Sequence, residues 1–275
     1  MAQAGARAGH ARVIAIASQK GGVGKTTTAV NLGVQLARRA QRTLVVDFDP
    51  QASASQVLGA TVDQLNELGA EGASIYDVVC NTRRNVPLPI LEVGEGLHLA
   101  PSHIDLAAAE QELNGRLGHE KVLAEKLGPL LGAYDFILID CPPSLGNLTI
   151  AALTAATEAL IPITPEAMAV QAVARLRDTI ALVQRHTNER LTIAGLLITI
   201  FDKRRSVARQ LEAALRQAHG RLVFDTVIRD RAIYTEDVLQ GAPTSVYAAG
   251  SPADQDYAAL AAEVLARDGR PPGGD

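Results

Sequence analysis

Residues 20–27 read Lys20-Gly21-Gly22-Val23-Gly24-Lys25-Thr26-Thr27. An apolar run, Val13 to Ala17, precedes this stretch, and a helical pattern from about Thr26 to Arg39 follows it. Strand, glycine-rich turn and helix form the context in which a phosphate-binding loop is expected. The glycines let several backbone N–H groups point at one anion, and the start of the helix adds its positive dipole end. The stretch therefore predicts a loop that binds the phosphates of a nucleotide.

The loop departs from the usual G-x-x-x-x-G-K-[ST] pattern. Its first glycine would fall at position 19, which is Gln19, and a second lysine, Lys20, stands at the start of the loop instead. Lys25 supplies a charge that reaches the β- and γ-phosphates, and Thr26 supplies the hydroxyl that ligates Mg²⁺. A flexible Gly/Lys turn on the surface is the alternative. Three glycines, two lysines and two hydroxyls in eight residues at a strand–helix junction argue against it.

Composition indicates a globular α/β protein. The chain has 275 residues, of which 47% are hydrophobic, enough for one substantial domain with a buried sheet. Two cysteines cannot form a disulfide framework or a four-ligand metal site within one chain, and a reducing cytoplasm fits them. No apolar run approaches the roughly 18 residues of a membrane helix. A net charge of −4 argues against a uniformly basic nucleic-acid binder but leaves a local patch open.

Carboxylates follow two predicted strands. The strand Thr43–Val46 ends in Asp47-Phe48-Asp49-Pro50-Gln51, one strand over from the phosphate loop. Ligands collect at the carboxyl ends of parallel strands, so these acids are placed to touch nucleotide, metal or water. Acids that cap a helix or face solvent are the alternative.

The second such strand is 136–139, and it ends in Asp140. Four apolar residues before an acid form the Walker B pattern, whose carboxylate lies beside Mg²⁺. The pattern is weak alone and strong downstream of a phosphate loop. Cys141-Pro142-Pro143-Ser144-Leu145-Gly146 follows it, and its two prolines stiffen the turn.

Strands alternate with helices along the whole chain, which predicts an α/β fold with a doubly wound, mostly parallel sheet and helices on both faces. We expect a flexible N-terminal arm (1–11), a single P-loop ATPase domain (12–268) and a disordered tail (269–275). Asp105 is predicted to cap a helix over 106–117, and Ser251 to begin a helix over 252–266. Further helices are expected over 120–131 and 235–239.

Taken together, the lysine-first loop, the D-x-D-P-Q segment and D-C-P-P-S-L-G closely resemble the ParA (Soj-like) family of deviant Walker A P-loop ATPases. The resemblance spans Arg12 to Glu263. It implies that ATP and Mg²⁺ are the cofactors, with Asp140 acting on the metal through water and Asp47 supporting the loop near the metal. It assigns catalysis to Lys20, Lys25 and Asp49, with Asp49 orienting the attacking water, and makes the segment after Asp140 a switch that senses the γ-phosphate. Outside the loop, the implied ATP contacts are Ile200, Phe201, Ile228 and Arg229.

A basic segment inside this acidic chain indicates a second surface. Between Gln184 and Arg231 there are ten basic and five acidic residues. Such a segment fits a DNA backbone, although an ordinary solvated helix face explains the charge equally well. Ile228-Arg229-Asp230-Arg231 stands where the family usually has I-P-R-N. The resemblance implies the following DNA-binding residues: Lys203, Arg204, Arg205, Arg209, Arg229 and Arg231.

The function implied by the resemblance is that of a slow, partner-stimulated DNA-partitioning ATPase. Two subunits would close over two ATP molecules, with each Lys20 reaching the partner's phosphates. This homodimer would bind nonspecific double-stranded DNA in the cytoplasm, on the nucleoid, and a ParB-like protein would stimulate hydrolysis and release.

The alternative is a MinD-like regulator of cell division that cycles on the membrane. It requires an amphipathic C-terminal helix, which the residues 266–272 cannot form, so no membrane partner is expected. A nucleotide-binding scaffold without hydrolysis is disfavoured by Asp49 and Asp140. The sequence leaves the cargo open, whether chromosome, plasmid or another complex.

Overall fold

The computed structural model describes residues 11–81, 86–166 and 169–267. The predicted C-terminal tail and residues 1–10 of the predicted arm lie outside these ranges. Ala11 is described, and it is buried, with its amide donating to the carbonyl oxygen of Leu131 at 2.9 Å.

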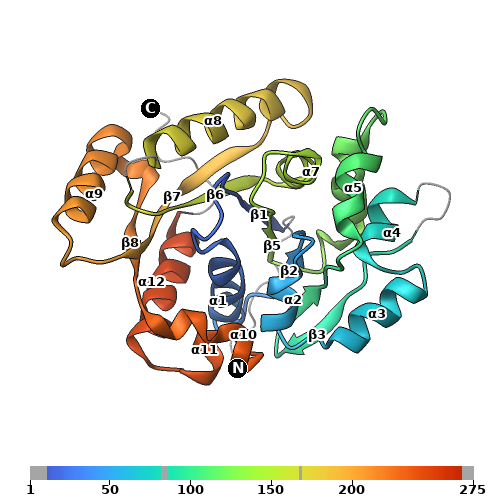
Figure 1. Cartoon of the computed structure of the whole chain (residues 1–275), viewed down its shortest axis with the longest axis horizontal. Coiled ribbons are helices and arrows are strands. Elements are labelled where there is room, and N and C mark those ends of the chain that lie inside the picture. Colours follow the sequence, from blue (N-terminus) through green and yellow to red (C-terminus); the bar gives the residue numbers. More distant parts are fainter. Residues whose placement is uncertain (1–10, 82–85, 167–168, 268–275) are drawn as a thin grey trace.

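Within the described residues, one eight-stranded sheet organises the chain, with strand order β3-β4-β2-β5-β1-β6-β7-β8 (Figure 1). All neighbouring strands are parallel except β3, which pairs antiparallel with β4 at one edge. The predicted doubly wound, mostly parallel sheet is confirmed, but β5 lies between β1 and β2, so the acids after β2 are two strands away from the phosphate loop and not one. The strands are β1 (Arg12–Ile16), β2 (Thr43–Asp47), β3 (Leu91–Gly94), β4 (Leu97–Ala100), β5 (Phe136–Asp140), β6 (Glu158–Ile163), β7 (Thr192–Phe201) and β8 (Val223–Arg229).

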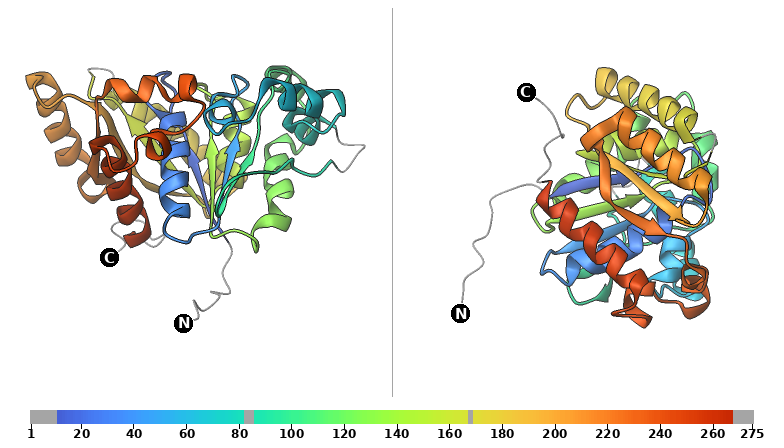
Figure 2. Two further views of the ribbon diagram at one scale, coloured as in Figure 1. Left: turned by 90° about the horizontal axis from the view of Figure 1, so that it is seen from below. Right: turned by 90° about the vertical axis from the view of Figure 1, so that its left-hand side faces the viewer.

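Helices cover both faces of the sheet, because its central strands are apolar on both sides. One core cluster packs α4 to α9 on one face, and a second packs α1, α2, α3 and α12 on the other. In the right-hand view of Figure 2 the sheet lies between α8 on one side and α12 on the other. The helices are α1 (Lys25–Ala37), α2 (Ser53–Val57), α3 (Val62–Ala70), α4 (Ile75–Cys80), α5 (Leu106–Glu112), α6 (Val122–Leu127), α7 (Asn147–Ala155), α8 (Ala169–His186), α9 (Ser206–His219), α10 (Asp237–Gln240), α11 (Thr244–Tyr247) and α12 (Pro252–Ala266), with short 3-10 turns η1 (His119–Lys121), η2 (Gly128–Leu130), η3 (Gly220–Leu222) and η4 (Ala232–Thr235).

The topology places a crevice beside β1. The chain leaves β1 through α1 to reach β2, and it leaves β5 through α7 to reach β6, on the other side of β1. The two crossovers run in opposite directions, so α1 and α7 lie on opposite faces (Figure 1). Ligands bind at such a switch point, outside the carboxyl ends of the strands.

Several local predictions were wrong. Asp105 makes no capping hydrogen bond and instead contacts His103, and the helix after it ends at Glu112. The expected helix over 120–131 is broken into η1, α6 and η2, and that over 235–239 becomes η4 and α10. Ser251 does cap α12, because its side chain accepts from the amide of Asp254. The failures lie where tertiary packing overrides weak local signals.

Candidate nucleotide-binding site

The loop between β1 and α1 is shaped by two glycines. Gly22 has φ +69° and Gly24 has φ +80°, a region of backbone conformation that side chains disfavour. Gly24 immediately precedes α1, so its left-handed conformation turns the chain into the helix. The loop thereby brings backbone amides and the positive end of α1 to one place, which is the arrangement that binds phosphate.

Lys25 begins α1 and is buried, with its Nζ donating to the backbone oxygen of Lys20 at 3.3 Å. Burial lowers the pKa of the Lys25 ammonium, and the neighbouring Asp140 carboxyl works against this. A desolvated ammonium beside an anion-binding loop gains strongly from a phosphate, because it has few competing water molecules.

Thr26 and Asp140 come together at the ends of neighbouring elements. The Thr26 hydroxyl donates to Asp140 Oδ2 at 2.7 Å. Asp140 is fully buried, and its Oδ1 has no hydrogen-bond partner among the described residues. Burial raises the pKa of the Asp140 carboxyl well above its usual range, and the nearby Asp47 raises it further. A hydroxyl and an unsatisfied carboxylate oxygen next to a phosphate loop fit a Mg²⁺ ion, whose charge would offset the cost of burying the acid.

Asp47 stabilises the neighbouring turn through buried hydrogen bonds. It lies opposite Asp140 in the sheet register and is fully buried. Its Oδ2 accepts from the amide and the hydroxyl of Ser55, both at 2.7 Å, and its Oδ1 accepts from the amide of Asp49 at 3.3 Å. Burial raises the pKa of Asp47 to about 6. Asp47 thus holds the start of α2 and the turn that carries Asp49, while Asp49 itself is partly exposed.

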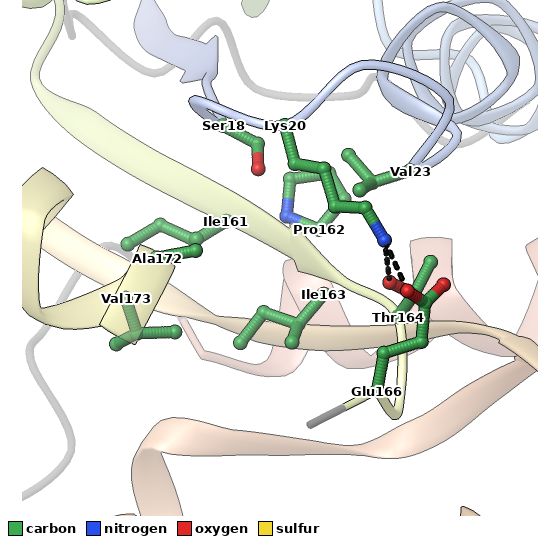
Figure 3. Close-up of a pocket in the computed structure, with 10 residues that line it drawn as sticks. All are labelled: Ser18, Lys20, Val23, Ile161, Pro162, Ile163, Thr164, Glu166, Ala172 and Val173. Carbon is green, nitrogen blue, oxygen red and sulfur yellow. Dashed lines mark hydrogen bonds and ion pairs between the residues drawn. The ribbon is translucent and has the colours of Figure 1, made fainter. Parts of the chain in front are cut away.

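Lys20 does not point into its own loop. Its Nζ contacts Glu166 Oε2 at 2.5 Å and Thr164 Oγ1 at 3.3 Å, just beyond the end of β6 (Figure 3). Both charged side chains are about half exposed, at 43% for Lys20 and 56% for Glu166. This ion pair holds the pKa of the Glu166 carboxyl below its usual range.

A pocket of about 230 Å³ opens beside the loop. Thr199 ties its floor to the loop, because its Oγ1 donates to the Val23 carbonyl oxygen at 2.8 Å. Ile200 lines the pocket with φ +52°, a strained value for a β-branched residue. The lining residues are Gly22, Gly24, Thr27, Thr199, Ile200, Ile228, Arg229, Asp230, Arg231, Tyr234, Thr235 and Tyr257.

The structure separates residues that the sequence grouped. Ile200, Ile228 and Arg229 line the pocket, whereas Phe201 does not and packs in the core cluster that contains α8 and α9. The alternation of the strand is interrupted between them, because Ile200 has a positive φ and the pairing with β8 shifts register between Ile198 and Phe201. Phe201 therefore packs in the same core cluster as Ile198, two strand positions before Ile200. Of the two, only the Ile200 side chain reaches the pocket.

The predicted DNA-binding residues form two groups. Lys203, Arg204, Arg205 and Arg209 are exposed around the start of α9. Arg229 and Arg231 line the pocket instead, and both pair with Asp256. β7 and β8 are neighbours, with Phe201 opposite Arg229, so the two groups leave adjoining strand ends.

Sequence reasoning missed Ser55, Glu166 and Asp256. Glu166 follows the end of β6 closely, so the strand-end argument applied to Asp47 and Asp140 also fits it. Ser55 and Asp256 give no local signal in the sequence. Ser55 acts through a residue 8 positions away, and Asp256 through residues at least 25 positions away.

The phosphate loop, the buried Walker B acid and the crevice between crossovers define a P-loop nucleotide-binding protein. A family model described as an AAA domain matches residues 11–193. The chain is 38% identical to the chromosome partitioning protein ParA of Myxococcus xanthus, over 94% of this chain and 89% of that protein. It is also 38% identical to the sporulation initiation inhibitor protein Soj of Bacillus subtilis, over 93% of this chain and 98% of that protein.

Among solved structures, a cobyrinic acid a,c-diamide synthase from Mycobacterium smegmatis with bound ADP and magnesium matches with a TM-score of 0.77 and 33% identity, covering 93% of this chain and 94% of that one. The chain belongs to the ParA/Soj family of partitioning ATPases. The family resemblance predicted from the three motifs is confirmed. No helix in the described part of the chain is long and apolar enough to cross a membrane.

Proposed function

We propose that this protein is an ATP-dependent DNA-partitioning ATPase. The observation that carries the proposal is the pairing of Thr26 with Asp140 beside the glycine loop, with one buried Asp140 oxygen left unsatisfied. The names of the M. xanthus and B. subtilis relatives support the cellular role. The bound ADP and magnesium of the M. smegmatis structure support ATP and Mg²⁺ as the cofactors.

Each residue of the loop has a role in this proposal. Backbone amides of residues 21–27 and the Lys25 ammonium hold the phosphates. Thr26, and Asp140 through a water molecule, would hold Mg²⁺, which would supply positive charge against the phosphates. Asp49, on the turn held by Asp47, orients the attacking water.

Dimerisation is proposed to complete the site. Lys20 extends outward from its own loop to Glu166, and from there it would turn to the phosphates of a second subunit once this ion pair breaks. The dimer binds nonspecific double-stranded DNA through Lys203, Arg204, Arg205 and Arg209. A ParB-like partner stimulates hydrolysis, and hydrolysis releases the DNA. The proposed location is therefore the nucleoid in the cytoplasm.

The named activity of the M. smegmatis relative offers a different reaction, the formation of cobyrinic acid a,c-diamide. Partitioning is favoured because the segments Asp47–Gln51 and Asp140–Gly146 match the ParA pattern. The relatives named ParA and Soj are also more similar in sequence than that protein.

Two substitutions separate nucleotide binding from chemistry. Lys25→Ala removes the ammonium opposite the phosphates, so ATP binding measured by calorimetry is expected to be lost. Asp49→Ala keeps the loop and Thr26–Asp140, so it is expected to bind ATP, lose hydrolysis by about 100-fold or more and accumulate as dimer. Hydrolysis by Asp49→Ala at the native rate would refute the role of Asp49. Native protein that binds no ATP would refute the proposed function.

A further inference from the structure

A buried carboxylate on the last helix holds two arginines together. Asp256 lies on α12 with its side chain only 7% exposed. Its Oδ1 accepts from Arg229 Nη1 at 2.5 Å, and its Oδ2 accepts from Nε and Nη2 of Arg231 at 3.3 and 3.2 Å. The backbone amide of Arg229 also donates to Oδ2, at 3.4 Å. One acid thus binds both guanidinium groups and the end of β8.

These arginines lie beside the nucleotide loop. Arg229 and Arg231 line the same pocket as Gly22, Gly24 and Ile200. Tyr257, the next residue of α12, lines it too, and its hydroxyl lies 3.5 Å from the Thr28 hydroxyl of α1. Asp256 and Tyr257 therefore connect the helix that starts at the phosphate loop with the far wall of the pocket.

The chemistry of the pocket suits a purine nucleoside. Phosphates belong at the loop, so the pocket beyond Gly22 and Gly24 receives the base and ribose. Arginine stacks on aromatic rings and donates several hydrogen bonds from a rigid plane. The Arg231 side chain is only 26% exposed, and two of its nitrogens bind Asp256, so its plane is fixed before a ligand arrives.

We propose that Asp256 is a positioning residue for the base-binding side of the nucleotide site. It fixes Arg229 and Arg231 as a wall against which the purine and its ribose bind, so these two arginines serve the nucleotide and not DNA. The arrangement replaces the family's I-P-R-N segment, where a proline stands at the position of Arg229. This inference rests on the proposed function, because it takes the triphosphate to bind in the loop.

The test compares two ligands, Mg-ATP and Mg-tripolyphosphate, by calorimetry. Tripolyphosphate reports the loop alone, whereas ATP also reports the base pocket. Asp256→Asn is expected to weaken ATP binding by about tenfold and to leave tripolyphosphate binding unchanged. Asp254→Asn is the matched control, because it removes a buried acid of the same helix that pairs with Arg38, outside the pocket lining. Its ratio of ATP to tripolyphosphate affinity should match that of the native protein.

Arg231→Gln provides a second route if Asp256→Asn fails to fold, as loss of both ligands would indicate. It removes one guanidinium from a side chain that is more exposed than Asp256, 26% against 7%, and should lower the same ratio by a similar factor. A native ratio in both variants, or in Arg231→Gln alone when Asp256→Asn is unfolded, would overturn the proposal. The proposal would also be overturned if Arg231→Gln kept the native ratio of ATP to tripolyphosphate affinity but lost DNA binding. Native protein that binds neither ligand would instead count against the proposed function.

Discussion

At the scale of single residues, Lys20 opens the phosphate loop directly after Gln19, which stands where the usual pattern has its first glycine, and its partner in the free subunit is Glu166. For Lys20 to reach another subunit's phosphates, that contact must break. The pair is half exposed, and exposed pairs contribute only ~0.2–1 kcal/mol. The ion pair with Glu166 therefore restrains Lys20 only weakly, and Lys20 can leave it at a small cost in free energy.

Substitutions at the two ends of this ion pair should act in opposite directions. Lys20→Ala is expected to bind ATP and sediment as a monomer, because it lacks the contact across the dimer. Glu166→Gln frees Lys20 in both subunits and should tighten ATP-dependent dimerisation by about two- to thirtyfold, from ~0.2–1 kcal/mol for each of the two pairs. Analytical ultracentrifugation with ATP measures both, with Glu189→Gln as an exposed-acid control. Undiminished dimerisation of Lys20→Ala would rule out the proposed contact, and weaker dimerisation of Glu166→Gln would place Glu166 in the dimer interface.

Asp237 of α10 is an acid buried against the loop helix. It accepts hydrogen bonds from Thr244, Tyr247 and Asn31, and burial raises the pKa of its carboxyl. Because the folded-state pKa lies above the unfolded value, the charged form costs stability above the folded pKa. That cost disappears as the pH falls through the folded pKa toward the unfolded one.

Asp237→Asn should therefore change the pH dependence of stability. On lowering the pH from 8 to about 4, close to the ordinary pKa of an Asp carboxyl, the native protein should gain stability relative to Asp237→Asn, because only the native residue titrates. Urea unfolding at both pH values, without nucleotide, gives the two free energies of unfolding. A stability difference between the two proteins that stays constant with pH, or that changes in the other direction, would mean that folding does not raise the pKa of the Asp237 carboxyl.

At the scale of elements, α1 joins the phosphate loop to the rest of its face of the sheet. Gly33 lets this helix approach β2 closely, since a Cβ at that position would lie 2.9 Å from Val45 Cγ2. Along its other side, Gln35 and Arg38 bind Asp254 of α12, and Asn31 binds Asp237 and the amide of Ser245. The loop helix is thus held by close packing on one side and by buried polar groups on the other.

Gly33→Ala tests the close packing. Alanine favours helix by ~1 kcal/mol over glycine, yet the clash with Val45 should dominate and lower the free energy of unfolding by ~1–3 kcal/mol. Gly132→Ala is the matched control, because a Cβ there meets nothing within 4 Å and its φ is not positive. Chemical denaturation measures both. Equal stability of the two variants would show that α1 can shift away from β2 at little cost in free energy.

At the scale of the whole molecule, the parallel strands deliver their loops to one edge of the sheet. The phosphate loop, Asp49, Asp140 and Glu166 all follow strand ends there, and so does the basic group around the start of α9. A dimer formed across this edge would place two such basic groups near one another. DNA binding is then expected to depend on ATP, because one subunit's group offers few phosphate contacts.

Removing two of these charges per subunit should flatten the salt dependence of DNA binding. Lys203→Gln with Arg205→Gln removes about four contacts per dimer, so the log–log salt slope should shrink by roughly 3–4. Arg185→Gln with Arg190→Gln changes the net charge equally at the opposite edge of the sheet and should leave the slope unchanged. Filter binding of random-sequence duplex, with ATP or ADP at several salt concentrations, measures it. Equal slopes for both pairs would move the DNA surface elsewhere.

The sequence by itself determined the local parts of this protein. Glycines with positive φ, unbroken apolar strands and acids at strand ends follow from properties of neighbouring residues. For that reason the loop, the alternation of strands and helices along the chain and the positions of Asp47 and Asp140 at strand ends could be predicted. The same local rules failed at Asp105 and over 120–131, where packing competes with weak capping and helix signals.

Only the tertiary structure decided which distant residues meet. Thr26 and Asp140 are 114 positions apart, Lys20 and Glu166 146 apart, and Arg231 and Asp256 25 apart. The placement of Ile200 at the pocket and of Phe201 in the core cluster, and the assignment of Arg229 and Arg231 to the pocket wall, were decided in the same way. A charged residue in the sequence does not show which group its side chain will contact. Its partner is fixed only when strand order and helix packing bring a second group within hydrogen-bonding distance and exclude the water that would otherwise solvate both.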